Sequence, residues 1–173
     1  PILDDPHDIA FTQNLGAGFH VLLRDPDTAI EMAKACLELC DQYSLVQERQ
    51  WATIWLGAAL AEKGRLKEGL ALVRASVQAQ SAMQAQISFT HYLSLIADIH
   101  CKAGEPDEGL TVLDEAFRIC GRTGETFFKP ELLRIQGELL LRKGAPAEAE
   151  SCFLGAIELA QAQQAKFLEL RAT

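Results

Sequence analysis

The sequence repeats itself with a period of 40 residues. Three glycines recur at this spacing, each followed four residues later by a glutamate: Gly64, Gly104 and Gly144. Three prolines share another column of the same register: Pro26, Pro106 and Pro146. The segment 24–29 fits this template as well, with Arg24 in the glycine column. A period of 20 to 50 residues is typical of repeat architectures, so the chain is interpreted as four repeats and the start of a fifth.

Each repeat predicts two antiparallel helices. Apolar residues between 131 and 143 recur with the spacing of a helical face, not with the alternation of a strand. Gly144 stands where a left-handed residue ends a helix, and Pro146 stands at the first position of the next one. The same pattern predicts helix pairs at 8–23 with 26–42, 46–63 with 66–82, 86–103 with 106–121, and 131–143 with 146–163. No segment has the pattern of a strand, so the expected fold class is all-α.

Small residues form columns across the repeats. One column lies in the first helices: Ala17, Gly57, Ala97 and Gly137. Two more lie in the second helices: Ala29, Gly69, Gly109 and Ala149, then Cys36, Ser76, Ala116 and Ala156. Bulky residues stand between those two columns: Val73, Leu113 and Phe153. Glycine inside a helix costs about 1 kcal/mol, so its recurrence predicts close helix contact.

This order of small, small, large and small residues resembles the tetratricopeptide repeat, most clearly in residues 137–149 followed by Phe153 and Ala156. The resemblance implies a right-handed α-α superhelix of about four helix pairs, turning near residues 24, 64, 104 and 144. Residues 1–173 would form a single repeat domain. The present unit has 40 residues where the usual repeat has about 34, and the six extra residues would lengthen the helices or the links between repeats.

Several segments narrow the resemblance to the C-terminal repeat region of large bacterial signalling ATPases: 51–54, 59–65, 68–70, 103–110, 123–125 and 131–141. In that family a nucleotide-triphosphatase module precedes the repeats, often with an adenylate/guanylate cyclase or a DNA-binding regulatory domain at one end. The resemblance implies a cytoplasmic regulatory fragment of a larger protein, which serves signal transduction as a sensor or protein-interaction arm.

Charge and cysteine content exclude other classes. Sixteen Lys and Arg against 24 Asp and Glu give a net charge of -8, which argues against a nucleic-acid partner. No run of about 18 apolar residues exists, so no contact with a membrane is expected. Five cysteines without a CxxC pair favour reduced thiols in the cytoplasm. Cys36 and Cys40 could share a metal, but further ligands are missing, so neither metal nor cofactor is expected.

The sequence does not predict an enzyme. It lacks the Gly-x4-Gly-Lys-Ser/Thr phosphate loop, and the GxG at residues 16–18 follows no predicted strand and is interpreted as helix packing. His91 and His100 belong to no HExxH or GxSxG motif. Four carboxylates could be offered for acid–base chemistry, but on an acidic helical repeat they are interpreted as a solvated face: Asp98, Asp107, Glu131 and Glu138.

The first helices of stacked pairs line the concave surface, so a binding groove is expected there. In the first two repeats its predicted lining is Phe11, Asn14, Gly18, Val21, Trp51, Ile54 and Ala58. In the last two repeats it is His91, Ser94, Asp98, Lys102, Glu131, Arg134, Glu138 and Arg142. Such a groove suits an extended or helical protein segment with a hydrophobic anchor near Trp51. Trp51 could equally fill the core between repeats, and Trp55 is expected to do so.

The leading hypothesis is a non-enzymatic scaffold whose partner is a protein or peptide segment, or another domain of its own parent chain. The family resemblance implies that a bound partner shifts the angles between repeats and so biases attached switch domains. The alternative is a peptide or small-molecule effector receptor, with a pocket around Phe11, Trp51 and Ile54. Catalysis by the fragment itself would require turnover that depends on Glu138 or His91, and none is expected.

Overall fold

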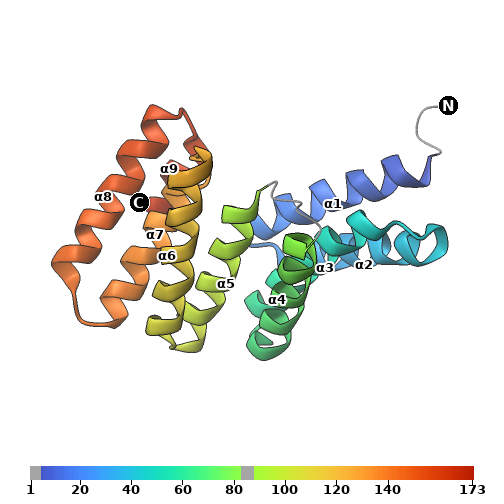
Figure 1. Cartoon of the computed structure of the whole chain (residues 1–173), viewed down its shortest axis with the longest axis horizontal. Coiled ribbons are helices and arrows are strands. Elements are labelled where there is room, and N and C mark those ends of the chain that lie inside the picture. The colour runs from blue at the N-terminus through green and yellow to red at the C-terminus, as the bar shows by residue number, and fades with distance from the viewer. Residues whose placement is uncertain (1–4, 83–87) are drawn as a thin grey trace. The chain divides into compact units, whose positions relative to one another are not determined.

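The computed structural model describes residues 5–82 and 88–173, and every regular element within these ranges is an α-helix. The chain divides into two compact units, Pro1–Ile87 (unit 1) and Ser88–Thr173 (unit 2). Unit 1 contains α1 (Pro6–Leu22), α2 (Pro26–Tyr43), α3 (Val46–Glu62) and α4 (Leu66–Ala82) (Figure 1). Unit 2 contains α5 (Phe89–Ala103), α6 (Pro106–Thr123), α7 (Lys129–Arg142), α8 (Pro146–Ala162) and α9 (Lys166–Ala172).

Consecutive helices pack as antiparallel pairs within each unit. In unit 1, α1 packs on α2 and α3 on α4, and α3 also contacts both helices of the preceding pair. In unit 2, α5 packs on α6 and α7 on α8, while α7 contacts both α5 and α6, and α9 contacts both α7 and α8. The all-α prediction and the predicted order of helix pairs are confirmed. The start predicted for the third pair differs, since α5 begins at Phe89; residues 86 and 87 lie outside the described ranges.

The turn inside each pair is made by a residue in the left-handed conformation, as the glycine column predicted. Gly64, Gly104 and Gly144 have φ of 82°, 75° and 77°, and Arg24 has φ of 57°. The next residue donates its backbone N–H to the carbonyl five positions earlier, as in Arg65 to Leu60 at 3.0 Å. This bond satisfies a helix-end carbonyl that would otherwise lack a partner. Left-handed residues also occur in the links after the pairs at four described positions: Ser44, Ser88, Gly124 and Gln164.

Replacing Arg24 by glycine is expected to raise the free energy of unfolding of unit 1 by about 0.5 to 1 kcal/mol. An L-residue in the left-handed conformation costs roughly 1 to 2 kcal/mol, and glycine avoids this cost. Glycine also has the greater backbone entropy in the unfolded chain, which offsets part of the gain in stability. Urea unfolding followed by tryptophan fluorescence measures it, because both tryptophans lie in unit 1. The matched reverse change, Gly64→Arg, should destabilise unit 1; loss of stability in Arg24→Gly would contradict the assignment.

The small-residue columns mark close helix contacts. A Cβ placed on Gly69 of α4 would lie 2.4 Å from the carbonyl oxygen of Gly57 on α3. In unit 2, a Cβ on Gly137 of α7 would lie 2.7 Å from the ring of Phe153 on α8. Glycine therefore stands where the neighbouring backbone or ring occupies the space that a side chain would need. The bulky Phe153 does pack against the small residue Gly137, and Val73 and Leu113, at the equivalent positions of earlier repeats, are fully buried.

The two units repeat several polar contacts at equivalent positions. Lys63 Nζ lies 2.6 Å from Asp27 Oδ1 in unit 1, and Lys143 Nζ lies 2.5 Å from Asp107 Oδ1 in unit 2. Each ion pair joins the end of a first helix to the start of the preceding second helix. These lysines and aspartates are exposed, so the pairs add little stability. Among the described helices, none is long and apolar enough to cross a membrane.

Candidate functional site

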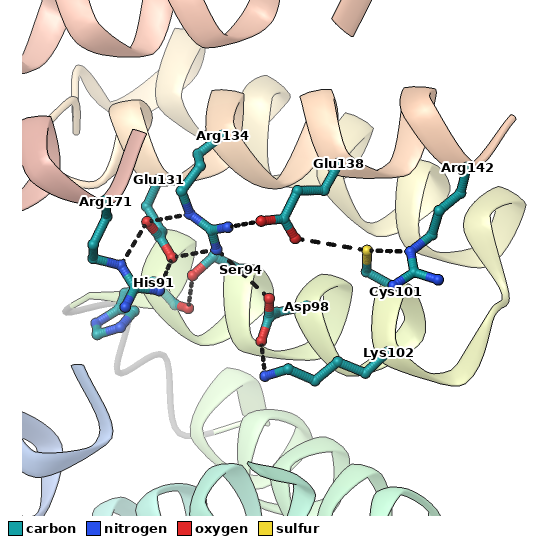
Figure 2. Close-up of polar contacts among 10 residues, drawn as sticks. All are labelled: His91, Ser94, Asp98, Cys101, Lys102, Glu131, Arg134, Glu138, Arg142 and Arg171. Carbon is teal, nitrogen blue, oxygen red and sulfur yellow. Dashed lines mark hydrogen bonds and ion pairs between the residues drawn. The ribbon is translucent and has the colours of Figure 1, made fainter. Parts of the chain in front are cut away.

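Unit 2 contains a row of interacting charged side chains along the facing sides of α5, α7 and α9, here called the charged row. Its members are Asp98, Cys101, Lys102, Glu131, Arg134, Glu138, Arg142 and Arg171 (Figure 2). On α7 the spacing of three, four and four residues places the four charged side chains on one helical face. Figure 2 shows this face turned toward α5, from which Asp98 and Cys101 reach toward α7, while Lys102 contacts Asp98.

Arg134 is the centre of the charged row. Its Nε and Nη2 donate to the two carboxylate oxygens of Glu131 at 2.9 and 2.8 Å. Its Nη1 donates to Glu138, and Nη2 also lies 3.6 Å from Asp98 Oδ1. The side chain is 2% exposed, so three carboxylates rather than water compensate its charge. These contacts outweigh the effect of burial and raise the pKa of the guanidinium, which therefore stays charged.

Glu131 is held by two arginines from different helices. Besides the fork of Arg134, it accepts from Arg171 of α9 at 2.6 Å to Oε1 and 3.2 Å to Oε2. Burial alone would raise the pKa of this carboxyl. Hydrogen bonds and positive charge from Arg134 and Arg171 outweigh burial and hold the pKa at about 2. Glu131 is therefore a fixed anion that fastens α9 to α7.

The other end of the charged row is open to solvent. Lys102 Nζ lies 2.5 Å from Asp98 Oδ2, and the side chains of Lys102 and Glu138 are 27% and 39% exposed. Arg142 is exposed and donates from Nε to the Cys101 sulfur at 3.2 Å. Within the described residues its guanidinium has no carboxylate partner, unlike that of Arg134. This end can bind an added anionic group, which the compensated buried end cannot.

His91 and Ser94 lie at the buried end of the row. The His91 ring stacks on Phe128 with a centroid distance of 3.9 Å, and Ser94 Oγ donates to the His91 carbonyl at 2.6 Å. Burial lowers the pKa of His91 to about 4, against the opposing influence of Glu131. The imidazole is therefore neutral near pH 7 and is shielded from solvent, which makes it part of the core rather than a proton donor to a ligand.

Acidification is expected to destabilise unit 2 through His91. A histidine whose folded pKa lies below its unfolded value of about 6.5 stabilises the fold above that value and loses this contribution as the pH falls toward 4. By pH 4.5 the loss should reach about 2 to 3 kcal/mol. In His91→Phe, which keeps a ring against Phe128, that part of the loss should vanish. Urea unfolding followed by circular dichroism at pH 7 and 4.5 measures it; parallel pH profiles would contradict it.

The predicted lining residues of unit 1 are brought together around α1 and α3. The rings of Phe11 and Trp51 meet edge to face, with centroids 6.3 Å apart, and Phe11 is 42% exposed. Asn14 is buried and donates from Nδ2 to the Glu48 carbonyl at 3.1 Å. Ile54 is fully buried, which corrects the expectation that its side chain lines the groove. It occupies the register position of Asn14 one repeat later, where an apolar side chain is removed from water.

Burial narrows the predicted lining to its accessible members. Six of the twelve partner-binding candidates are at most 5% exposed: Asn14, Ile54, His91, Ser94, Glu131 and Arg134. The other six retain contact with solvent: Phe11, Trp51, Asp98, Lys102, Glu138 and Arg142. Figure 2 joins six of the eight candidates of the last two repeats in one network, with Cys101 as the link to Arg142, and it joins His91 and Ser94 to each other. A binding partner approaching this structure would meet only the accessible set.

Two members of the charged row were absent from the predicted lining, Cys101 and Arg171. Cys101 is buried, and burial raises the pKa of its thiol, so Arg142 contacts a neutral sulfur. Arg171 lies forty residues after Glu131 and in the register column of Phe11 and Trp51, so the repeat pattern could have indicated it. The register column alone does not show that Arg171 contacts Glu131, because that contact depends on how α9 packs on α7.

The chemistry available to this row is recognition by charge and hydrogen bonding. Each of its three carboxylates faces a cation: Asp98 faces Lys102, Glu131 faces two arginines, and Glu138 faces Arg134. For Glu131 the two arginines hold the pKa at about 2, so this carboxylate is a poor proton acceptor at neutral pH. Within residues 5–82 and 88–173, no group of three or more His, Cys, Asp or Glu side chains is arranged to hold a metal ion.

The sequence was compared with known proteins. No model of a protein family matches the chain, and no curated protein matches it. The family resemblance stated from the repeat pattern therefore remains a prediction. Support for a function comes from the residues of this chain, namely the consecutive helix pairs and the accessible end of the charged row in unit 2.

Proposed function

We propose that this chain is a non-enzymatic helical-repeat scaffold of the tetratricopeptide type, wound as a right-handed superhelix, which binds a protein or peptide segment. Two features support the repeat type: left-handed turns recur at the predicted positions, and small residues recur where helices touch. The first helices α5 and α7 carry the charged row, and polar side chains on the first helices are where a repeat scaffold holds its partner.

The observation that carries the proposal is the uncompensated guanidinium of Arg142 at the exposed end of the row. Arginine binds carboxylates through two parallel hydrogen bonds when its fork is available. Lys102 stands on the facing helix α5, one residue after the sulfur that Arg142 contacts. We therefore propose a bound segment that places an acidic side chain against Arg142 and a further polar group near Lys102 and Glu138.

Selection of peptides by the intact chain tests this proposal. Random dodecapeptides displayed on phage would be selected on the protein, and the binders measured by fluorescence anisotropy with Arg142→Ala. Loss of the bidentate pair should weaken binding at least about tenfold, equivalent to about 1.4 kcal/mol. Arg122→Ala is the matched control, since Arg122 is an exposed arginine in the last turn of α6. Equal effects of the two variants would refute the Arg142 site.

The wider role implied by the resemblance is also a proposal. The chain would act as the sensor or interaction arm of a cytoplasmic bacterial signalling ATPase or regulator, in which partner binding biases an attached output domain. The reading frame around this segment tests it directly. A phosphate-binding loop encoded upstream is the expected result. Start and stop codons close to the two ends would instead leave a free-standing adaptor and refute the signalling-ATPase assignment.

A specific observation favours a second candidate, an effector receptor in unit 1. The indole Nε1 of Trp51 and the amide Oδ1 of Asn14 are buried and have no hydrogen-bond partner among the residues that the structure describes. A small polar ligand beside Phe11 could satisfy such groups, whose burial without partners costs free energy. In a Trp55→Phe background, a change of Trp51 fluorescence with short peptides, absent in Trp51→Phe, would support this receptor. Unchanged fluorescence with peptides that bind through Arg142 would favour the scaffold.

A further inference from the structure

An apolar stripe lies exposed along α1. Phe11, Leu15 and Phe19 follow one another at spacings of four residues and are 42%, 60% and 57% exposed, and Leu23 extends the line. Residues four apart lie on the same side of a helix, so these side chains form one continuous face. A contiguous exposed apolar face of this kind marks an interaction surface more often than single exposed leucines do. The question is what covers it.

The repeat register indicates what covers its central part, because the positions of Phe19 and Thr12 are covered in later first helices. The positions equivalent to Phe19 are Ala59 in α3 and Leu139 in α7, and both are fully buried. The position equivalent to Thr12, an exposed residue beside the stripe, is Ala52, which is also fully buried. Positions that are exposed in α1 are thus buried at the equivalent place in α3, and for Phe19 also in α7.

In each case the covering element is the preceding helix pair. The ring of Trp51, equivalent to Phe11, packs edge to face on Phe11 of α1. The ring of Trp55, equivalent to Leu15, lies 3.0 Å from where a Cβ would stand on Gly18 of α1. Ala52 packs in one cluster with residues of both helices of the preceding pair: Ala10, Cys36 and Cys40.

The second helix of the preceding pair leaves room for the covered side chain because it has a glycine at the point of contact. In unit 2, a Cβ on Gly109 of α6 would lie 2.7 Å from a methyl group of Leu139, so only glycine leaves room for that leucine. Phe19 stands in the same column and is larger than leucine. The element that covers α1 therefore needs a small residue on its first helix opposite Leu15, and a glycine on its second helix opposite Phe19.

We infer that the α1 stripe is the docking surface for a further antiparallel helix pair that presents these two small residues. The partner is thus a helix hairpin of the same repeat pattern as α3 with α4, which have Ala58 and Gly69 at these two positions. Docking would continue in unit 1 the contact that α7 makes with α6 in unit 2. This surface is separate from the Arg142 end of the charged row, and its test is independent of the peptide selection.

The test supplies such a hairpin in register. A copy of residues 88–124 that carries Asp98→Ala is joined ahead of Asp5, which keeps the 40-residue spacing and places the copied Gly109 opposite Phe19. The change in the copy supplies the small residue opposite Leu15, where α5 itself has Asp98. Thr12→Cys then reports coverage of α1 through its rate of reaction with a maleimide, corrected for the native cysteines. Leu154→Cys, at an exposed leucine of α8, is the matched control. A third chain carries Gly109→Leu in the copied hairpin only.

Docking should slow the labelling of Thr12→Cys at least tenfold in the extended chain and leave that of Leu154→Cys unchanged. The Gly109→Leu change in the copied hairpin should restore the fast rate. Two results would overturn the inference. One is an equal labelling rate of Thr12→Cys with and without the hairpin. The other is slow labelling of the original chain that depends on its concentration, with light scattering showing a dimer, since a second copy would then cover the stripe.

Discussion

Replacing Arg134 by methionine is expected to lower the free energy of unfolding of unit 2 by about 3 to 5 kcal/mol. The change leaves the 5% exposed Glu131 with one cation instead of two, and Glu138 and Asp98 lose their shared partner. Breaking a buried ion pair on one side costs this much, because the remaining charge keeps its desolvation penalty. Urea unfolding followed by far-ultraviolet circular dichroism measures the loss.

Two further variants test whether the loss of stability comes from the buried ion pairs of Arg134. Arg122→Met removes an exposed arginine of α6 and should change stability by less than about 0.5 kcal/mol. Replacing Glu131 by leucine together with Arg134→Met should cost less than Arg134→Met alone, since no buried carboxylate is then left without its main partner. If Arg134→Met is as mild as Arg122→Met, the charged row does not stabilise unit 2.

Replacing Gly69 by alanine is expected to destabilise unit 1 by about 1 to 2 kcal/mol. The new Cβ would stand 2.4 Å from the Gly57 carbonyl oxygen and 2.9 Å from the Ala61 Cβ, so α3 and α4 must move apart. Backbone atoms cannot rotate away as a flexible side chain can, and overpacking of this kind costs typically 1 to 3 kcal/mol. This cost outweighs the gain of about 1 kcal/mol from the higher helix propensity of alanine. Tryptophan fluorescence in urea follows the unfolding of unit 1.

Gly121→Ala is the matched control for this variant. Gly121 lies in α6, and a Cβ there meets nothing within 4 Å. It should therefore show the propensity gain alone, about 0.5 to 1 kcal/mol of added stability. The double variant Gly57→Ala with Gly69→Ala should cost less than the sum of the single variants, because the helices separate only once. A stabilising Gly69→Ala would show that α3 and α4 are not in close contact.

The fold was predictable to the level of helix pairs because the signals for it are local. Gly104 and Pro106 end one helix and begin the next through backbone conformation and a missing N–H, effects that act within a few residues. The turns after the pairs were harder to recognise, since Ser44 and Gln164 adopt the left-handed conformation without glycine. Tertiary packing holds them there against their own preference.

The candidate site was predictable as a set of positions but not as a set of contacts. The helical register correctly grouped Glu131, Arg134, Glu138 and Arg142 on one face, because side chains three and four apart share a face. Register does not say how far away the facing helix lies, and so it could not distinguish the buried Arg134 from the exposed Arg142.

The sequence by itself determined the class of structure: helices, their order, their turns and the positions where they touch. Those features follow from short-range conformational preferences repeated every 40 residues. The tertiary structure decided which polar groups lose water. Arg171 reaches Glu131 across forty residues and, together with Arg134, keeps this buried carboxyl charged. Burial depends on neighbours from distant parts of the chain, so the side chains left accessible for a partner were visible only once the helices had packed.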